Sequence, residues 1–379
     1  MTSYLDHNAT TPLDEAVLEA MMPYLKQGYG NPSSAHVFGR RAREAVEASR
    51  ARISEASGGG RVIFTGGGSE ANNLFVKGVA ATLPPGRIAV SAIEHSSVSR
   101  AAAALTRSGW TLRRLAVDWQ GFVDCDDCRE GFEAPTAMAS VMLANNETGV
   151  IQDIPRIAEQ ARAMKIWMHT DAVQAFGKMP VDFRALGVHA MSLSAHKIGG
   201  PKGVGALVVD KRLSLLPLVD GGGQETGLRS GTENVAGIVG FGVAASLAVS
   251  RLEARAEALL AIRLHLEKAL AQMGAVLFSG GDACLPNTAC FAFPGIDGPT
   301  LVVEMDRAGH AIGSGSACSS GATEPSEVLL SMGVSPEIAR GAVRVSLGQG
   351  SDLAGIEAFL SSLAATLSRL RGLSALAYA

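Results

Sequence analysis

Two short stretches of this chain carry residue types that could do chemistry together. Lys197 lies in the run Ser-Ala-His-Lys-Ile-Gly-Gly, directly after the apolar residues 188–193. Asp171 closes an earlier apolar run and is followed three residues later by Gln174. Pyridoxal 5′-phosphate needs an amine for its Schiff base and a carboxylate that keeps the pyridine nitrogen protonated, so that the ring acts as an electron sink. The two stretches therefore predict a pyridoxal phosphate site.

A cysteine supplies a second reactive group further along the chain. Cys318 stands in Ser-Gly-Ser-Ala-Cys-Ser-Ser-Gly, residues 314–321. A thiolate in such a segment can attack the sulfur of a bound substrate and become a persulfide. The alternative is a cysteine buried as a small apolar residue, which is common for this residue type but disfavoured by the Ser/Gly-rich flanks.

A glycine-rich turn at residues 66–68 joins an apolar run to a helical pattern. Free backbone amides at a helix N-terminus suit a phosphate group, and Ser69 adds a hydroxyl donor. The spacing is not G-x-G-x-x-G, so a dinucleotide site is disfavoured. An ordinary turn between a strand and a helix is the alternative.

Further polar residues follow the ends of apolar runs. His95 could stack on a pyridine ring and transfer protons, or be a histidine with an ordinary loop role. Asn146, in Asn-Asn-Glu-Thr-Gly, could donate to a phenolate oxygen, although Asn and Gly are also common in turns. Ser194 and His196 could donate to phosphate oxygens. Asp171 could instead cap a helix.

The elements that must position these residues alternate between short strands and helices. Apolar runs predict strands at 61–65, 87–91, 111–117, 137–143, 166–170, 190–193 and 205–209. Helical patterns separate several of them, at 70–81, 97–108 and 154–164. This alternation predicts an α/β fold with a mostly parallel sheet of about seven strands, whose ligands bind at the carboxyl ends of the strands.

The two ends of the chain are predicted to be organised differently. Residues 14–56 read as helical with an interruption at 28–34, and residues 235–273 form a long Ala/Leu-rich helical stretch. We expect a large domain at 14–250. A smaller α+β domain is expected to combine 1–13 with 251–379, with strands near 290–293 and 342–346.

Composition restricts the class of protein. The chain has 379 residues, 47% of them apolar, a formal net charge of −3 and five cysteines. Neither nucleic acid nor a membrane is expected as a partner, because there is no basic excess and no uninterrupted apolar span. The absence of a signal-peptide pattern and the odd cysteine count predict reduced thiols and a cytoplasmic location.

Taken together, these motifs resemble the cysteine desulfurases of the NifS/IscS group, which are class V aminotransferase-like enzymes of pyridoxal phosphate fold type I. The resemblance runs over nearly the whole chain, from Tyr4-Leu-Asp-His-Asn-Ala-Thr-Thr-Pro12 to Val343-Arg-Val-Ser-Leu-Gly348. It implies L-cysteine as substrate, L-alanine as product, and sulfur left as a Cys318 persulfide. It also implies transfer of that sulfur to an acceptor or scaffold protein, with iron–sulfur cluster assembly as the expected purpose.

The resemblance assigns roles residue by residue. Lys197 becomes the Schiff-base lysine, His95 stacks on the ring, and Arg344 pairs with the substrate carboxylate. Thr232 is expected to reach the phosphate bound by the other protomer of a homodimer. The remaining cofactor contacts divide between phosphate (Gly68, Ser69, Ser194, His196) and ring (Asn146, Asp171, Gln174).

Other readings remain open at this stage. A different class V enzyme, such as an aminotransferase or a selenocysteine lyase, would share the cofactor site, and a sulfur-carrier protein without catalysis would share the thiol. No metal site is predicted, because Cys125 and Cys128 lack a second pair with zinc-like spacing. Whether Cys318 holds a transient iron–sulfur cluster stays open. The sequence departs from the family pattern at His7, Ser69 and Thr226.

Overall fold

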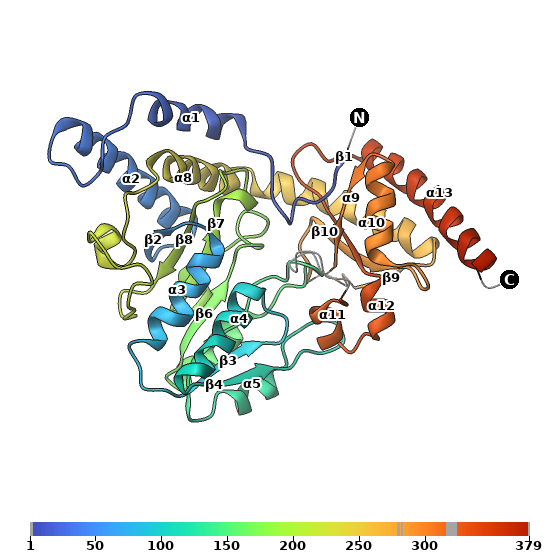
Figure 1. The fold of residues 1–379 in the computed structure, drawn as a ribbon, viewed down its shortest axis with the longest axis horizontal. Helices are drawn as coiled ribbons and strands as arrows, with labels where there is room; N and C mark the ends of the chain where they lie inside the picture. The colour runs from blue at the N-terminus through green and yellow to red at the C-terminus, as the bar shows by residue number, and fades with distance from the viewer. Residues whose placement is uncertain (1–2, 279–280, 282, 316–323, 378–379) are drawn as a thin grey trace.

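The computed structural model describes residues 3–278, 281, 283–315 and 324–377. A seven-stranded sheet in the order β2–β8–β7–β6–β5–β3–β4 forms its larger part (Figure 1). Every neighbouring pair is parallel except the two made by β8, which runs antiparallel to β2 and β7. The strands are β2 Arg61–Thr65, β3 Arg87–Ser91, β4 Thr111–Leu115, β5 Thr136–Ser140, β6 Trp167–Asp171, β7 Ala190–Ser194 and β8 Gly205–Val209.

Helices cover both faces of this sheet. On one face, α3 (Gly68–Ala80) and α4 (Ser96–Leu105) enclose a core that includes Phe75 and Leu207. The other face carries a second core beneath further helices, namely α2 Val37–Ala56, α5 Cys125–Gly131, α6 Ile154–Ala163, α7 Phe183–Leu186 and α8 Val235–Ser250. Strands β2, β3 and β8 are short and mostly apolar because both of their faces are largely buried.

The helical prediction for residues 14–56 resolves into two helices. Helix α1 spans Glu15–Lys26 and is capped by the Asp14 carboxylate, which accepts from the amide of Ala16 at 3.0 Å. Helix α2 follows after the Gly/Asn/Pro/Ser segment that predicted the interruption. Both pack against α8. The long stretch at 235–273 is likewise two helices, α8 and α9 (Leu252–Gln272), with a 69° bend between them.

A smaller unit follows α8 (Figure 1). Its four-stranded antiparallel sheet has the order β12–β13–β10–β9. The strands are β9 Val276–Leu277, β10 Thr288–Ala292, β12 Gly313–Ser314 and β13 Val343–Ser346, and the helices are α9, α10 Gly298–Arg307, α11 Glu327–Ser331, α12 Pro336–Arg340 and α13 Leu353–Ala377. The N-terminal strand β1 (Ser3–Tyr4) joins this unit by pairing in parallel with β11 (His310–Ala311).

Nearly all strand predictions for the large sheet lie within two residues of the observed strands at each end. The exception is β5, where the predicted strand extends three residues beyond the observed end at Ser140. The large, mostly parallel sheet of seven strands and the smaller α+β unit are confirmed. The exact domain limits, 14–250 against 1–13 with 251–379, stay a prediction.

Helix α13 has an apolar window at Leu353–Gly372 that is long and apolar enough to cross a membrane by length and composition. The sequence analysis expected no such window. Its residues Ile356, Phe359 and Leu363 are buried in the core of the smaller unit. Since 28% of the window is buried, this packing accounts for part of the apolar composition of the helix, and length and hydropathy alone do not assign it to a membrane.

Candidate functional site

A cavity of about 770 Å³ opens at the carboxyl edge of the large sheet, where parallel strands present the residues that follow them. It is lined by residues from the ends of β2, β3, β5, β6 and β7, from the N-terminal segment and from β13. Ten of the sequence-predicted site residues meet there, namely Gly68, Ser69, His95, Asn146, Asp171, Gln174, Ser194, His196, Lys197 and Arg344.

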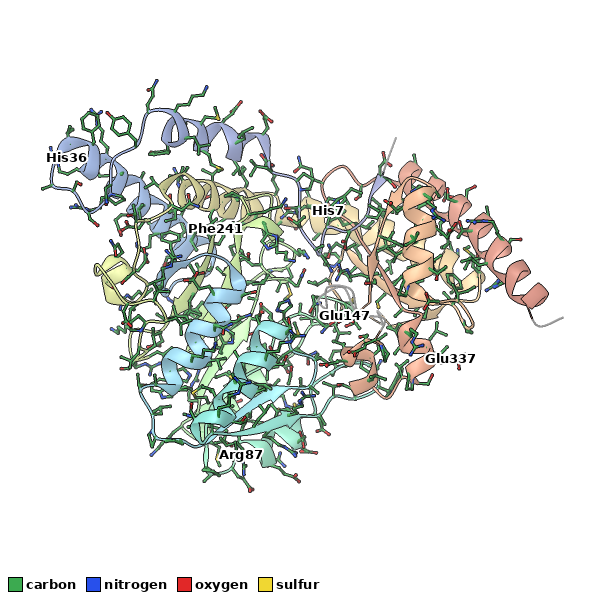
Figure 2. The ribbon with its side chains drawn as sticks, in the orientation of Figure 1. His7, His36, Arg87, Glu147, Phe241 and Glu337 are labelled. Atoms are coloured by element: carbon green, nitrogen blue, oxygen red, sulfur yellow. The ribbon has the colours of Figure 1, made fainter. Side chains whose placement is uncertain are left out.

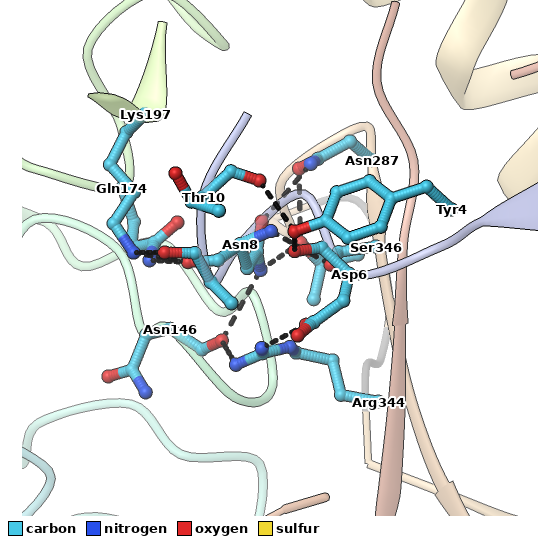
Figure 3. Close-up of polar contacts among 12 residues, drawn as sticks. Tyr4, Asp6, Asn8, Thr10, Asn146, Gln174, Lys197, Asn287, Arg344 and Ser346 are labelled. Carbon is cyan, nitrogen blue, oxygen red and sulfur yellow. Dashed lines mark hydrogen bonds and ion pairs between the residues drawn. The ribbon is translucent and has the colours of Figure 1, made fainter. Parts of the chain in front are cut away.

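Lys197 ends the short helical turn that follows β7. Its ammonium group donates hydrogen bonds to the backbone carbonyls of Asn8 and Ala9, the latter at 2.9 Å (Figure 3). The same N-terminal segment is tied to the lysine loop by Thr11, whose amide and hydroxyl both donate to the carbonyl of His196 at 2.9 Å. Residues far apart in sequence therefore hold the lysine at the cavity wall.

Asp171 ends β6, the central strand of the sheet, and is almost completely buried. Its Oδ2 accepts from the Asn72 amide nitrogen at 2.6 Å, and its Oδ1 accepts from the backbone amide of Val173 at 2.9 Å. Both oxygens of this carboxylate therefore have a hydrogen-bond donor, and the two bonds fix its orientation at the end of β6. The sequence analysis gave Asn72 no role, and its position on α3, four residues after Gly68 of the glycine-rich turn, was the available signal.

His95 lies between β3 and α4 and caps that helix. The backbone amide of Ser97 donates to its Nδ1 at 3.1 Å, so Nδ1 carries a lone pair and the proton of the neutral ring is on Nε2. Burial lowers the pKa of His95; the nearby Asp171 charge opposes this shift, and the smaller effect of the Lys197 charge adds to it. The ring is therefore uncharged at neutral pH and can lie against a planar ligand without desolvating a charge.

The glycine-rich turn and the start of α3 form one corner of the cavity. No side chain caps α3, because its N-cap residue is Gly67 at φ 151°. Gly205 of β8 lies so close that a Cβ there would meet the backbone of Gly67 at 2.6 Å. Close backbone approach and uncapped amides at a helix N-terminus are what an anion such as phosphate requires.

Two side chains near Lys197 line the same cavity. Ser194 is buried, lines the cavity, and its hydroxyl has no hydrogen-bond partner among the described residues. His196 lines the cavity as well, and burial together with the charges of Lys197 and Lys202 lowers its pKa to about 4. A buried hydroxyl without a partner destabilises the folded protein unless a ligand supplies the missing hydrogen bond.

Arg344 reaches the cavity from the smaller unit, on β13. One guanidinium nitrogen donates to Asp6 at 2.6 Å and another donates to the backbone carbonyl of Asn146 at 2.8 Å. The guanidinium is buried, and its Nε has no partner in the described part of the chain. A positive group with a free donor at a cavity wall suits a carboxylate ligand.

Two predicted residues are not among those that the structure places at this cavity. Thr232 is exposed and does not line it. Cys318 lies outside the described residues, so its predicted role is not placed by the structure. The other four cysteines are free thiols, and burial raises the pKa of Cys128 to about 12 and of Cys284 to about 12.

The arrangement fits pyridoxal phosphate on structural grounds. The cavity joins an uncapped helix N-terminus, a buried hydroxyl without a partner among the described residues, a buried carboxylate and an amine within one volume of about 770 Å³. These groups match the phosphate, the pyridine nitrogen and the aldehyde of that cofactor in chemical type. Asp6, Asn8 and Asn72 also belong to the site or support it, and the sequence analysis gave them no role.

Comparison with known proteins agrees with this geometry. Residues 3–359 match the family described as aminotransferase class-V. A relative named cysteine desulfurase IscS from Dictyoglomus turgidum is 41% identical over 377 residues, covering 98% of this chain and 96% of the relative. A cysteine desulfurase from Cereibacter sphaeroides is also 41% identical, with 98% and 97% covered.

Solved structures show the same likeness. A NifS-like protein has a TM-score of 0.92 and 35% identity, covering 97% of this chain and 100% of its own. The structure of SspA in complex with cysteine has a TM-score of 0.81 and 35% identity, with 91% and 99% covered. Both the fold and the sequence therefore place this chain among the aminotransferase class-V proteins, and it is a member of that family.

Proposed function

We propose that this protein is a pyridoxal phosphate-dependent L-cysteine desulfurase, with Cys318 as the residue that receives the sulfur. The observation that carries the proposal is the meeting of Lys197, Asp171 and Arg344 around one cavity, from two sheets and three distant parts of the chain. Relatives named cysteine desulfurase support it, because they share about two residues in five over nearly the whole length.

Each residue has a distinct part in the proposed reaction. The bound cofactor would supply an electron sink that weakens bonds at the α-carbon of the amino acid. Lys197 would hold the cofactor aldehyde, and Asp171 would keep the pyridine nitrogen protonated. The α3 N-terminus with Ser69, Ser194 and His196 would hold the phosphate, with Asn146 and Gln174 at the ring.

Arg344 and His95 act on the substrate side in this proposal. Arg344 would bind the α-carboxylate and so orient the amino acid, since a guanidinium donates in a fixed fork. His95 would stack on the ring and exchange protons with the substrate.

Cys318 completes the transfer. Its thiolate attacks the substrate sulfur, the carbon–sulfur bond breaks, and the electron pair of that bond returns to carbon, which takes up a proton to become L-alanine. The sulfur stays on the enzyme as a Cys318 persulfide. An acceptor or scaffold protein then removes it, with iron–sulfur cluster assembly in the cytoplasm as the proposed destination.

We also propose a homodimer. Thr232 is exposed on its own protomer and away from the cavity, which is consistent with a contact to the partner's cofactor phosphate. Exposed apolar side chains gather at the outer ends of α1 and α2, where Tyr29 and Phe38 stack at 5.5 Å. Contiguous apolar groups in water are typical of association surfaces.

The test is product analysis with L-cysteine and a reductant, for the wild type, Cys318→Ala and Lys197→Ala. The wild type should release alanine and sulfide in equal amounts. Cys318→Ala should lose both products while keeping the visible band of the bound cofactor, and Lys197→Ala should lose that band. Products from Cys318→Ala at the wild-type rate would favour a lyase route without an enzyme persulfide. Transamination that survives in Cys318→Ala would favour an aminotransferase.

A further inference from the structure

A second lysine, Lys178, lies behind the cavity wall and takes no part in the roles above. Its Nζ donates to Oδ1 of Asn8 and to Oε1 of Gln174, each at 2.7 Å. It does not line the main cavity, although Gln174 and Asn8 both do. Burial lowers the pKa of Lys178 well below its usual value, and the charges of Lys197 and Arg344 act in the same direction.

A lysine nitrogen with two short contacts to amide oxygens donates to both, whichever protonation state it has. An amide side chain has an oxygen end that accepts and a nitrogen end that donates, and the two ends are interchangeable unless neighbours distinguish them. Because the Lys178 nitrogen donates to Gln174 and to Asn8, it favours the orientation in which the amide oxygen of each residue faces the lysine.

The other contacts of Gln174 agree with that orientation. Its Nε2 donates to the backbone carbonyl of Asn8 at 3.0 Å. With the amide reversed, its oxygen would face the Asn8 carbonyl and that hydrogen bond would be lost, while its N–H would face Lys178, which cannot accept a hydrogen bond in its ammonium form. Asn8 is fixed in the same way, since its Nδ2 donates to Thr288 at 2.9 Å while its Oδ1 also accepts from Asn287 at 3.2 Å.

The orientation decides the chemistry of the cavity wall next to the reactive lysine. The Gln174 amide nitrogen keeps a second N–H beyond the one given to Asn8, so this residue can act as a donor toward a ligand. The Asn8 carbonyl that accepts from Gln174 also accepts from Lys197 (Figure 3). One network therefore links Lys178, through Gln174 and Asn8, to the amine that would carry the cofactor.

We propose that Lys178 is a positioning residue that holds the Gln174 amide as a hydrogen-bond donor toward the phenolate oxygen of bound pyridoxal phosphate. This inference rests on the proposed function, and it adds a residue that neither lines the cavity nor contacts the substrate. A donor at the phenolate stabilises its negative charge, and a less basic phenolate holds the neighbouring Schiff-base proton less tightly. Lys178 therefore helps to set the pH at which that proton is lost.

The experiment is a double-mutant cycle on the full chain reconstituted with pyridoxal phosphate. The variants are Lys178→Met, Gln174→Ala and both together, with Lys268→Met on the exposed face of α9 as a control for loss of a lysine. The readouts are the midpoint pH of the visible-band titration, the dissociation constant of pyridoxal phosphate, and the thermal unfolding temperature of the protein without cofactor.

Lys178→Met should raise the midpoint by about half to one pH unit, since the loss of a hydrogen bond is worth roughly that shift. Cofactor affinity should fall by about two- to tenfold. In the Gln174→Ala background, Lys178→Met should add no further shift, because the lysine acts through that amide. Lys268→Met should leave both readouts at the wild-type values.

Three outcomes would overturn the inference. An unchanged midpoint in folded Lys178→Met would overturn the inference. So would a shift of equal size in the Gln174→Ala background, because it would mean a direct charge effect. If Lys178→Met does not fold, Gln174→Glu replaces the donor by an acceptor, and an unchanged midpoint there would overturn the inference as well. A wild-type protein without a visible band would instead refute the proposed function itself.

Discussion

Arg344 shows how single side chains are held ready for a ligand in this cavity. Its charge is buried, and the carboxylate of Asp6 neutralises it at 2.6 Å. Burying a charge is costly unless a partner compensates for it, so Asp6 is part of what keeps the guanidinium in place. The pairing crosses the chain almost from end to end, from residue 6 to residue 344.

Asp6→Asn should weaken substrate binding more than turnover. The neutral amide leaves the Arg344 charge without its partner, and we expect KM for L-cysteine to rise about tenfold with a smaller change in kcat, since a charge-assisted hydrogen bond is worth roughly 1.5 kcal/mol. Steady-state kinetics measure this. Asp210→Asn, which breaks the exposed pair with Arg212, is the control and should leave KM unchanged. A fall in kcat alone would contradict the assignment.

Glu94 is a buried carboxyl beside His95, and burial raises its pKa to about 8, with Asp171 nearby acting in the same direction. Its Oε1 accepts from the hydroxyl of Ser91 at 2.7 Å and from the amide of Met142 at 2.6 Å, whereas Oε2 has no partner among the described residues. The proton therefore belongs on Oε2 in the folded protein at neutral pH.

Glu94→Gln should change how stability depends on pH. The folded-state pKa lies above the unfolded value of 4.5, so the stability due to this proton is fully present below that value and is lost as the pH rises to about 8. The variant cannot titrate, so its unfolding free energy should fall less steeply over this range, by up to about 1.4 kcal/mol per pH unit. Denaturant unfolding at several pH values measures this, and parallel curves for the two proteins would refute it.

Among the elements, the contact between β8 and the glycine-rich turn is a close constraint beside the cavity. Gly205 pairs with Thr65 in the antiparallel register, and the turn begins at the next residue. A Cβ on Gly205 would meet the Gly67 backbone at 2.6 Å and the Leu193 carbonyl at 2.7 Å. Neither backbone atom can move away as a flexible side chain would.

Gly205→Ala should destabilise the protein by about 1–3 kcal/mol, the usual cost of an overpacked core, and should weaken cofactor binding because the turn must shift. Thermal unfolding and a pyridoxal phosphate titration measure the two effects. Gly372→Ala in α13 is the matched control, since a Cβ there meets no atom within 4 Å. Equal stabilities of the two variants would show that the close approach relaxes without cost.

Over the whole molecule, the N-terminal segment ties the two units together. Strand β1 pairs with β11 of the smaller unit, and the residues that follow contact the lysine loop of the larger one. Figure 2 places His7 between the units and His36 at the far end of the larger one, beside Tyr29 and Phe38. The exposed aromatic pair thus lies far from the smaller unit.

Phe38→Ser should weaken self-association if this aromatic pair lies in the proposed dimer interface. Phe38 is 45% exposed and Tyr29 is 79% exposed, so the substitution removes little from the protomer core. Sedimentation or light scattering over a dilution series should show a dissociation constant raised by about tenfold or more, as for a central aromatic contact. Trp119→Ser, at an exposed tryptophan elsewhere, is the control. An unchanged dissociation constant would place the interface on another surface.

Local patterns in the sequence were sufficient for much of the fold and for several cavity residues. Strands β2, β3 and β8 have the predicted limits, because continuous apolar runs between turn signals are typical of strands buried on both faces. The polar residues after β3, β5, β6 and β7 lie at one edge of the sheet, because these strands are parallel and end there. Strands β9 and β12 were missed because two residues are too few to form a pattern.

The sequence by itself determined the alternation of strands and helices, and it placed Lys197 and Asp171 at the edge where ligands bind. Tertiary structure alone decided which partners complete the site. Asp6 reaches Arg344 and Lys178 reaches Asn8 across more than 160 residues of chain. Hydrogen bonds and ion pairs of this kind depend on the distance between atoms in space, and no periodicity along the chain records that distance.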